Sequence, residues 1–284
     1  MNNSFETSSI LELIRLALKE DINNGDHSSL ACIPINAKGE VKLLVKEKGI
    51  IAGVEIAKMV FKEIEPSCEF TTLINDGQKV NYGDIVFTLK ATSQTLLKGE
   101  RLALNYMQRM SGIATSTAEY CKLIEGTNTK LLDTRKTTPN NRIFEKLAVK
   151  IGGGYNHRFG LYDMVMLKDN HIDFAGGITS AIKKTNQYLN DNNLDLKIEV
   201  EVRDFTELNE VLACGNIDRI MLDNFTVLDT IKALKLINNK FETESSGGIT
   251  NKTIRSYAET GVDYISVGAL THQINSLDLS LKAI

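Results

Sequence analysis

The chain has 284 residues, which is enough for one large domain or two modest ones with buried cores. Hydrophobic residues make up 42% of it and charged residues 24%, as in an ordinary soluble globular protein. A formal net charge of -3 and an isoelectric point near 5.9 argue against a nucleic acid or a membrane as partner, because both favour a basic surface. Any anion site must therefore be a local cluster of cations.

The cysteines and the N-terminus bear on the compartment. The four cysteines (Cys32, Cys68, Cys121 and Cys214) show no paired spacing, which favours reduced thiols over disulfides or a zinc site. The first ten residues contain no basic segment followed by an apolar one, and no apolar run approaches the roughly 20 residues that cross a bilayer. We therefore expect a cytoplasmic protein.

The first part of the chain predicts a small sandwich of strands and helices. Ser9 and Glu12 have the spacing of a helix capping box, and apolar residues follow them at helical intervals. Residues 40–53, 68–74 and 84–92 are strand-like and are separated by turn sequences, and residues 54–64 alternate at helical period. Residues 95–125 then predict a long helix, bent at Ser111 and Gly112.

From residue 129 onward the pattern becomes regular. Short apolar runs lie at residues 130–135, 164–169, 197–202, 218–224, 241–248 and 263–269, separated by helical segments of a dozen or so residues. This alternation predicts parallel strands joined by right-handed crossovers. Six such units are fewer than the eight of a complete barrel.

Polar residues follow the carboxyl end of each of these runs. They are Asp133 to Lys136, Lys168 to His171, Glu201, Asp223 with Asn224, Ser245 to Gly248, and Gly268. Active sites of barrel enzymes lie on this face because the loops there converge. The sequence therefore predicts one shared site at the carboxyl ends of the strands.

Cations dominate this predicted site: Arg135, Lys136, Arg158 and Lys168, with His157 beside them. Arginine matches the geometry of carboxylate and phosphate, and lysine supplies a point charge. Three consecutive glycines, 152–154, predict a loop that carries His157 and Arg158 as a mobile pair. A ligand with several negative charges is expected.

Two further features leave alternatives open. The glycines of "SSGGIT" and "SVGAL" could let backbone N–H groups and a helix dipole bind phosphate, or could be plain turns. Glu201 and Asp223, at the ends of neighbouring strands, could serve a Mg²⁺ ion, sugar hydroxyls, general acid–base catalysis, or salt bridges to the nearby lysines.

Several of these segments together resemble the quinolinate phosphoribosyltransferase family. They are "EDINNGDHSS", "ERLALNYMQRMSGIAT", "LDTRKTTPNNRIFEKLAVKIGGGYNHRFGLYDMVMLKDNHI", "IEVEV", "IMLDNF", "ESSGGI" and "DYISVGALTH", and they run collinearly over nearly the whole chain. The sequence departs from the family pattern at Asn140, where a glycine is usual, and at residues 23–24 and 28–29. None of these departures touches a charged residue of the predicted site.

The resemblance implies a fold and a reaction. The fold is an N-terminal α/β sandwich, residues 1–112, to which a tail of residues 270–284 returns, and an incomplete six-stranded α/β (TIM-like) barrel, residues 113–269. The reaction joins quinolinate and phosphoribosyl pyrophosphate to give nicotinate mononucleotide, pyrophosphate and CO₂ in NAD biosynthesis, with Mg²⁺ as cofactor. A homodimer is also implied.

The resemblance also implies roles for residues. Arg135, His157, Arg158 and Lys168, with Thr134 and with Arg101 from a neighbouring subunit, surround the quinolinate carboxylates. Phosphoribosyl pyrophosphate is bound by Lys136, Glu201, Asp223, Ser246, Gly247, Gly248, Val267, Gly268 and Ala269, with Mg²⁺ at Glu201 and Asp223, directly or indirectly. Lys136, Lys168, Glu201 and Asp223 form the implied catalytic set.

Two other functions remain open from the residues alone. Lys168 at a strand end could form a Schiff base, as in an aldolase-type lyase. A non-catalytic barrel that binds a metabolite is the other. The aldolase hypothesis leaves the arginines unexplained, and the sensor hypothesis predicts lost site residues, whereas all are present. A related molybdenum-utilisation protein is disfavoured by "TTPN" and "GGGYNHR".

Overall fold

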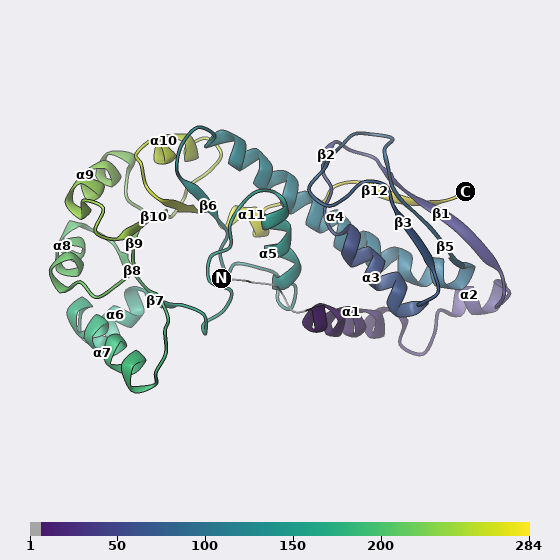
Figure 1. Cartoon of the computed structure of the whole chain (residues 1–284), viewed down its shortest axis with the longest axis horizontal. Coiled ribbons are helices and arrows are strands. Elements are labelled where there is room, and N and C mark those ends of the chain that lie inside the picture. The colour runs from purple at the N-terminus through teal and green to yellow at the C-terminus, as the bar shows by residue number, and fades with distance from the viewer. Residues whose placement is uncertain (1–6) are drawn as a thin grey trace. The chain divides into compact units, whose positions relative to one another are not determined.

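The computed structural model describes residues 7–284, and the chain divides into two compact units (Figure 1). The first unit holds the residues up to 118 together with 137–153 and 270–284, and the second holds 119–136 and 154–269. The predicted boundary at residue 112 lies six residues before this division. The segment 137–153, which the sequence placed in the barrel, groups with the first unit.

The helices of the first unit begin with α1 (Thr7–Ile22), which buries Ile10 and Ile14. It starts two residues before Ser9, so the predicted cap at Ser9 is wrong: Thr7 and Ser8 extend the helix instead. Helix α2 (His27–Cys32) is capped by Asp26, whose carboxylate accepts from the Ser29 N–H. Helix α3 (Val54–Ile64) has the predicted bounds.

The strands of the first unit form two small sheets. Within residues 7–284, β12 (Leu279–Ala283), β1 (Lys38–Val45), β5 (Ile85–Thr92) and β3 (Glu69–Thr72) make an antiparallel four-stranded sheet in that order. A shorter pair joins β2 (Gly49–Ile50) to β4 (Lys79–Val80). The core beside these strands is apolar, with Leu43, Phe61, Phe87 and Met107 fully buried. The predicted strands and turns are confirmed.

The long helix α4 (Ser93–Leu123) passes through Ser111 and Gly112 without a break. Ser111 Oγ accepts from the Ala52 N–H and donates to the Ala52 carbonyl. A Cβ at Gly112 would lie 2.2 Å from the Asn275 carbonyl oxygen, so only glycine allows this approach. These two residues thus serve close backbone packing within the first unit.

Helix α5 (Arg142–Ile151) belongs to the first unit because its contacts are there. Arg109 of α4 donates to the Glu145 carboxylate at 2.8 Å, and Glu145 is completely buried. A Cβ at Gly152 would lie 2.5 Å from the Ala114 carbonyl, so the first glycine of the triplet allows α5 to end against α4.

The second unit contains a six-stranded parallel sheet within the described residues. Its order is β6 (Lys130–Leu132), β11 (Tyr264–Ser266), β10 (Glu242–Ser246), β9 (Arg219–Asp223), β8 (Ile198–Val202) and β7 (Val165–Leu167). Strands β6 and β7 are the edges, as expected for an incomplete barrel. The mixed α/β fold class predicted from the sequence is confirmed.

Helices cover the outside of this sheet, as Figure 1 shows for α7, α8 and α9. The helices of this part of the chain are α6 (Asp169–Ala175), α7 (Ile178–Asp191), α8 (Phe205–Cys214), α9 (Val227–Ile237) and α10 (Ile254–Ala258). Helix α11 (Ala269–His272) begins at the last residue of the second unit and continues into the first. Over residues 7–284, none of the helices is both long and apolar enough to cross a membrane.

The two faces of this sheet differ in chemistry. Because side chains alternate along a strand, Ile198, Val200 and Val202 share one face of β8 and belong to an apolar cluster with the helices. Glu199 and Glu201 share the other face, and both are buried. The inner face of the barrel therefore carries buried charged residues, with Met166 and Met221 beside them.

Candidate active site

The loop after β6 carries the first predicted site residues. Asp133 is completely buried, whereas Arg135 and Lys136 are exposed. Thr134 Oγ1 accepts a hydrogen bond from the Lys136 N–H at 3.0 Å. The loop thus buries the Asp133 carboxylate and exposes the two cations, Arg135 and Lys136, to solvent.

The loop that carries His157 and Arg158 is anchored by hydrogen bonds. Asp133 accepts from the His157 N–H at 2.8 Å and from the Asn156 amide at 2.6 Å. The Arg158 guanidinium donates to the Met164 carbonyl at 3.1 Å. His157 is only 8% exposed. The buried Asp133 carboxylate thus anchors the loop at Asn156 and His157.

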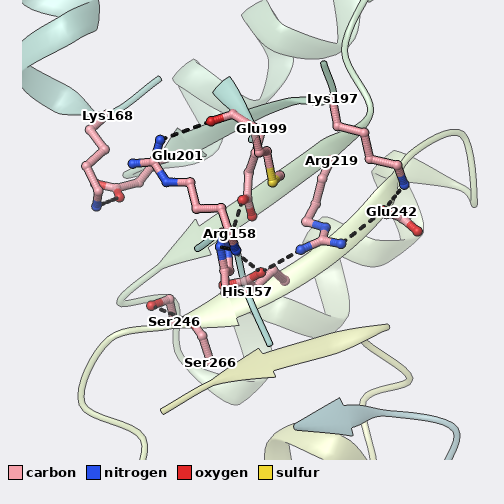
Figure 2. A network of polar contacts seen from close by, with 12 residues as sticks. His157, Arg158, Lys168, Lys197, Glu199, Glu201, Arg219, Glu242, Ser246 and Ser266 are labelled. Carbon is pink, nitrogen blue, oxygen red and sulfur yellow. Dashed lines mark hydrogen bonds and ion pairs between the residues drawn. The ribbon is translucent and has the colours of Figure 1, made fainter. Parts of the chain in front are cut away.

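The His157 ring points down into the barrel, as Figure 2 shows. Its Nε2 lies 2.9 Å from Glu199 and 3.4 Å from Glu244, and its Nδ1 accepts from the Arg158 N–H at 2.7 Å. Burial acts to lower the pKa of His157, but the two carboxylates outweigh it and raise the pKa to about 9. Nδ1 can accept a hydrogen bond only when the ring is neutral. The hydrogen bond from Arg158 therefore favours the neutral ring, whereas the carboxylates favour the protonated ring.

The partners of His157 are themselves buried and charged. Glu199 and Glu244 have no exposed surface, and the Arg219 guanidinium lies 3.1 Å from Glu244. Burial and the Glu244 charge raise the pKa of Glu199 to about 7. Burial also opposes ionisation of Glu244, but His157, Ser266 and Arg219 outweigh it and lower its pKa.

The sequence interpretation placed Asp133 at the site but missed Glu199, Arg219 and Glu244. A signal for all three was present, because "IEVEV" and "ETESS" each place two glutamates two positions apart in a buried strand, and "RIMLD" places Arg219 and Asp223 on one face of another. Alternation of this kind in a parallel strand covered by helices indicates a polar interior.

Arg158 lies close enough to other charges of the site for its pKa to shift. Burial lowers the pKa of Arg158, and the neighbouring Arg135 guanidinium lowers it further. The structure thus brings these two predicted cations together. Two partly repelling guanidinium groups favour an anion between them.

Lys168 and Glu201 form an ion pair at the carboxyl ends of β7 and β8, with Nζ and Oε2 2.5 Å apart. Of the alternatives for Glu201, the salt bridge to a nearby lysine is therefore observed. Asp223 ends the neighbouring β9, is half-buried, and accepts from the Asn224 amide at 2.7 Å.

The glycine loops after β10 and β11 show one clear constraint. Gly247 has φ +91°, and a Cβ there would lie 2.2 Å from the Asn224 side chain. Gly248 has φ +60° and faces open space. The helices that follow are short, α10 with five residues and α11 with four, so the predicted helix dipole is small.

The remaining predicted residues are placed as follows. Ser246 ends β10, and its Oγ lies 3.1 Å from that of Ser266. Val267 is buried, and Gly268 and Ala269 are half-buried. Arg101 lies on α4 in the first unit and is exposed.

Comparisons with known proteins agree along the whole chain. The family described as quinolinate phosphoribosyl transferase, N-terminal domain, matches residues 26–111, and its C-terminal domain matches residues 113–282. A mitochondrial quinolinate phosphoribosyltransferase [decarboxylating] 2b of Nicotiana tabacum is 44% identical over 97% of this chain and 82% of its own length.

A bacterial relative and a solved structure are similar too. A probable nicotinate-nucleotide pyrophosphorylase [carboxylating] of Bacillus subtilis (strain 168) is 42% identical over 92% of this chain and 89% of its own. The crystal structure of NadC from Streptococcus pyogenes has a TM-score of 0.92 and 38% identity, and the match covers 100% of both chains.

Proposed function

The chain belongs to the quinolinate phosphoribosyltransferase family, and we propose that it catalyses the reaction of that family. In this reaction the phosphoribosyl group passes from phosphoribosyl pyrophosphate to quinolinate. CO₂ and pyrophosphate leave, and nicotinate mononucleotide is formed for NAD biosynthesis.

The observation that carries the proposal is the cluster of cations at the carboxyl ends of the strands. Arg158 is partly buried beside Arg135, and the burial and the like charge both lower its pKa. Quinolinate brings two carboxylates, so a dianion relieves the repulsion between these guanidinium groups. Lys168 and His157 extend the same cluster within the second unit.

The chemistry asks mainly for positioning and charge neutralisation. The pyridine nitrogen attacks the anomeric carbon as pyrophosphate departs, through a transition state with oxocarbenium character. The ribosylated ring is then cationic, and its charge stabilises the carbanion left by the departure of CO₂. Within this scheme Arg135, Arg158 and Thr134 hold the carboxylates, and Lys136 and Lys168 balance charge during transfer. His157 stands behind Arg158, because both of its ring nitrogens contact the protein.

Glu201 and Asp223 suit the phosphoribosyl pyrophosphate end of the site. They are hard oxygen donors on neighbouring strands, which fits Mg²⁺, and Asp223 fits better because Glu201 is paired with Lys168. Mg²⁺ would neutralise pyrophosphate as it leaves. Ser246 offers a hydroxyl, and Gly247, Gly248, Gly268 and Ala269 lie where backbone N–H groups could reach a phosphate. The Val267 N–H is not such a donor, because it donates to the Leu132 carbonyl at 3.0 Å.

The lyase alternative loses support in this geometry. A Schiff-base lysine must present a free amine, whereas Lys168 is ion-paired with Glu201. The alternative of a non-catalytic barrel that binds a metabolite is not supported either, because it predicts the loss of site residues, and every predicted charged site residue is present.

The direct test mixes the protein with quinolinate labelled in the carboxylate next to the ring nitrogen, phosphoribosyl pyrophosphate and Mg²⁺. Labelled CO₂ and nicotinate mononucleotide are expected. Nicotinic acid serves as the control substrate: its single carboxylate makes at least one charge-assisted hydrogen bond fewer, which costs about 1.5–3 kcal/mol, or roughly ten- to a hundredfold. Equal turnover of both acids, or trapping of Lys168 by borohydride, would contradict the proposal.

The proposal extends to a homodimer in which Arg101 reaches the partner's site. Arg101 is exposed on α4, and a two-fold dimer lets each subunit complete the other's site. Inactive Arg101→Ala and Lys136→Ala homodimers should regain about a quarter of wild-type activity when mixed, since about half the dimers are hybrids with one intact site. No recovery after confirmed subunit exchange would remove Arg101 from a shared site.

A cytoplasmic location is also part of the proposal. The four cysteines are free in the described part of the chain, which suits a reducing compartment. Cell fractionation tests this, and recovery with an organelle or a membrane would oppose it.

A further inference from the structure

A chain of alternating charges runs through the inside of the barrel (Figure 2). Lys197 pairs with Glu242 at 3.2 Å, and Glu242 pairs with Arg219 at 3.1 Å. Arg219 then contacts Glu244 at 3.1 Å, and Glu244 lies 3.4 Å from the ring of His157, which Glu199 also contacts at 2.9 Å. This chain links the amino ends of the strands to the candidate site.

Stability does not explain why charges fill this interior. Barrel interiors are usually packed with Val, Ile and Leu, and replacing a buried ion pair with apolar residues is often neutral or stabilising. Glu199 and Glu244 are completely buried, so their desolvation is costly. Their presence calls for a role beyond holding the sheet together.

The two glutamates lie next to predicted site residues along their own strands. Glu199 precedes Glu201 by two positions on β8, and Glu244 precedes Ser246 by two positions on β10, so each pair shares the inner face. Both reach the same nitrogen of His157 from opposite sides of β9. Movement of either carboxylate therefore displaces the imidazole.

The position of His157 in turn sets that of Arg158. The Arg158 N–H donates to His157 Nδ1, while the His157 N–H donates to Asp133. The ring is thus held at Nε2 by carboxylates and, in its neutral form, also at Nδ1 by the backbone N–H of the next residue. A shift of the ring moves the start of the arginine side chain.

We propose that Glu199 and Glu244 are positioning residues that hold His157 and the backbone of Arg158 in the conformation that binds the carboxylates of quinolinate. The inference rests on the proposed function. A metal ion held by His157, Glu199 and Glu244 is a weaker explanation for the cluster, because the Arg219 guanidinium already neutralises Glu244 and repels a cation.

The test compares Glu199→Gln and Glu244→Gln with Glu242→Gln. Glu242 is the matched control: it pairs with Arg219 as Glu244 does, but it is partly exposed and two residues farther from the site. We expect the KM for quinolinate to rise about tenfold or more in the first two variants. The KM for phosphoribosyl pyrophosphate should stay within about twofold, and the control should match wild type in both.

A second readout follows the His157 ring nitrogens by ¹⁵N NMR in the protein alone. Their chemical shifts should change in Glu199→Gln and Glu244→Gln and remain in the Glu242→Gln control. This readout needs no turnover. If wild type fails to use quinolinate, the proposed function fails, while the NMR result still decides whether the two glutamates hold the ring.

The variants Glu199→Asp and Glu244→Asp cover the case in which the glutamine variants do not fold. They keep the buried charges but withdraw the carboxylate by one methylene, and they should raise the KM for quinolinate to an intermediate degree. Folded variants with the wild-type KM for quinolinate and unchanged His157 shifts would overturn the proposal and leave the network a purely structural role.

Discussion

The two units of the chain differ in the side chains that they bury beside their main sheets. The first unit packs apolar side chains, such as Leu43, Phe61 and Phe87, beside its antiparallel sheet. The inner face of the second unit's parallel sheet buries Glu199, Arg219 and Glu244 instead, whereas the apolar side chains of its opposite face pack with the outer helices. The first arrangement depends on volume, and the second depends on charge balance and direction.

This difference teaches where substitutions should matter. An apolar core tolerates exchanges that conserve volume, because contacts are non-directional. A buried ion network fails when one member is lost, because its partner stays desolvated without compensation. The second unit should therefore be the more sensitive to single changes in charge.

The largest effect should follow Arg219→Met, which leaves Glu244 without its guanidinium partner. We expect the opening free energy of β8, β9 and β10 to fall by about 3 kcal/mol or more. Leu43→Met in the first unit should cost less than about 1.5 kcal/mol. Hydrogen exchange with peptide resolution measures each unit separately. Equal losses in both variants would show that the two cores respond alike.

The next largest effect concerns ligand binding, and it separates the quinolinate end of the candidate site from the phosphoribosyl pyrophosphate end. Arg158→Ala should weaken quinolinate about a hundredfold, because a carboxylate loses its guanidinium partner. Asp223→Asn should instead weaken phosphoribosyl pyrophosphate in the presence of Mg²⁺ and leave quinolinate nearly unchanged. Calorimetry with each ligand decides, and the assignment is wrong if both variants lose both ligands equally.

The pH dependence of stability should differ between the units as well. The folded state raises the pKa of His157 from 6.5 to about 9, owing to Glu199 and Glu244. The protonated His157 therefore stabilises the folded state fully below pH 6.5, and this stabilisation is lost as the pH rises through 9. Hydrogen exchange should show β8 to β10 losing protection between pH 7 and 9, after correction for the intrinsic rate.

His157→Gln supplies the control for this pH dependence. The variant removes the titrating imidazole, while the groups that face it (Glu199, Glu244 and the Arg219 beyond them) remain. If the amides of β8 to β10 lose as much protection between pH 7 and 9 in this variant as in wild type, the pH dependence belongs to another group.

The smallest effect should come from an ion pair on the surface. Arg15 and Glu63 lie 2.7 Å apart in the first unit, and the arginine side chain is 62% exposed. Solvent screens such a pair, so Arg15→Ala should leave stability nearly unchanged in urea unfolding. A loss comparable to that of Arg219→Met would mean that burial does not decide the strength of these pairs.

Much of the fold was predictable because local patterns specify it. The helix of residues 54–64 and the six short runs after residue 129 follow from periodicity and turn residues, and all appear in the structure. The start of the first helix was not predictable to the residue, since Thr7, Ser8 and Ser9 are chemically alike at a helix end.

The candidate site was predictable in its outer part. Residues that follow a strand, such as Arg135, Lys168 and Asp223, must lie at its carboxyl end whatever the strand order. Their meeting at one edge follows from parallel strands alone. Their exact partners, such as Glu201 for Lys168, depend on side-chain directions that no local pattern contains.

By itself, then, the sequence determined the number of strands in the second unit, their parallel direction and the residues at their ends, because periodicity and turn chemistry are local. Only the tertiary structure decided that β6 lies beside β11, that residues 137–153 group with the first unit, and that His157 turns inward to Glu199 and Glu244. The physical reason is that burial and charge pairing join residues far apart in the chain, and each depends on the neighbours that the completed fold supplies.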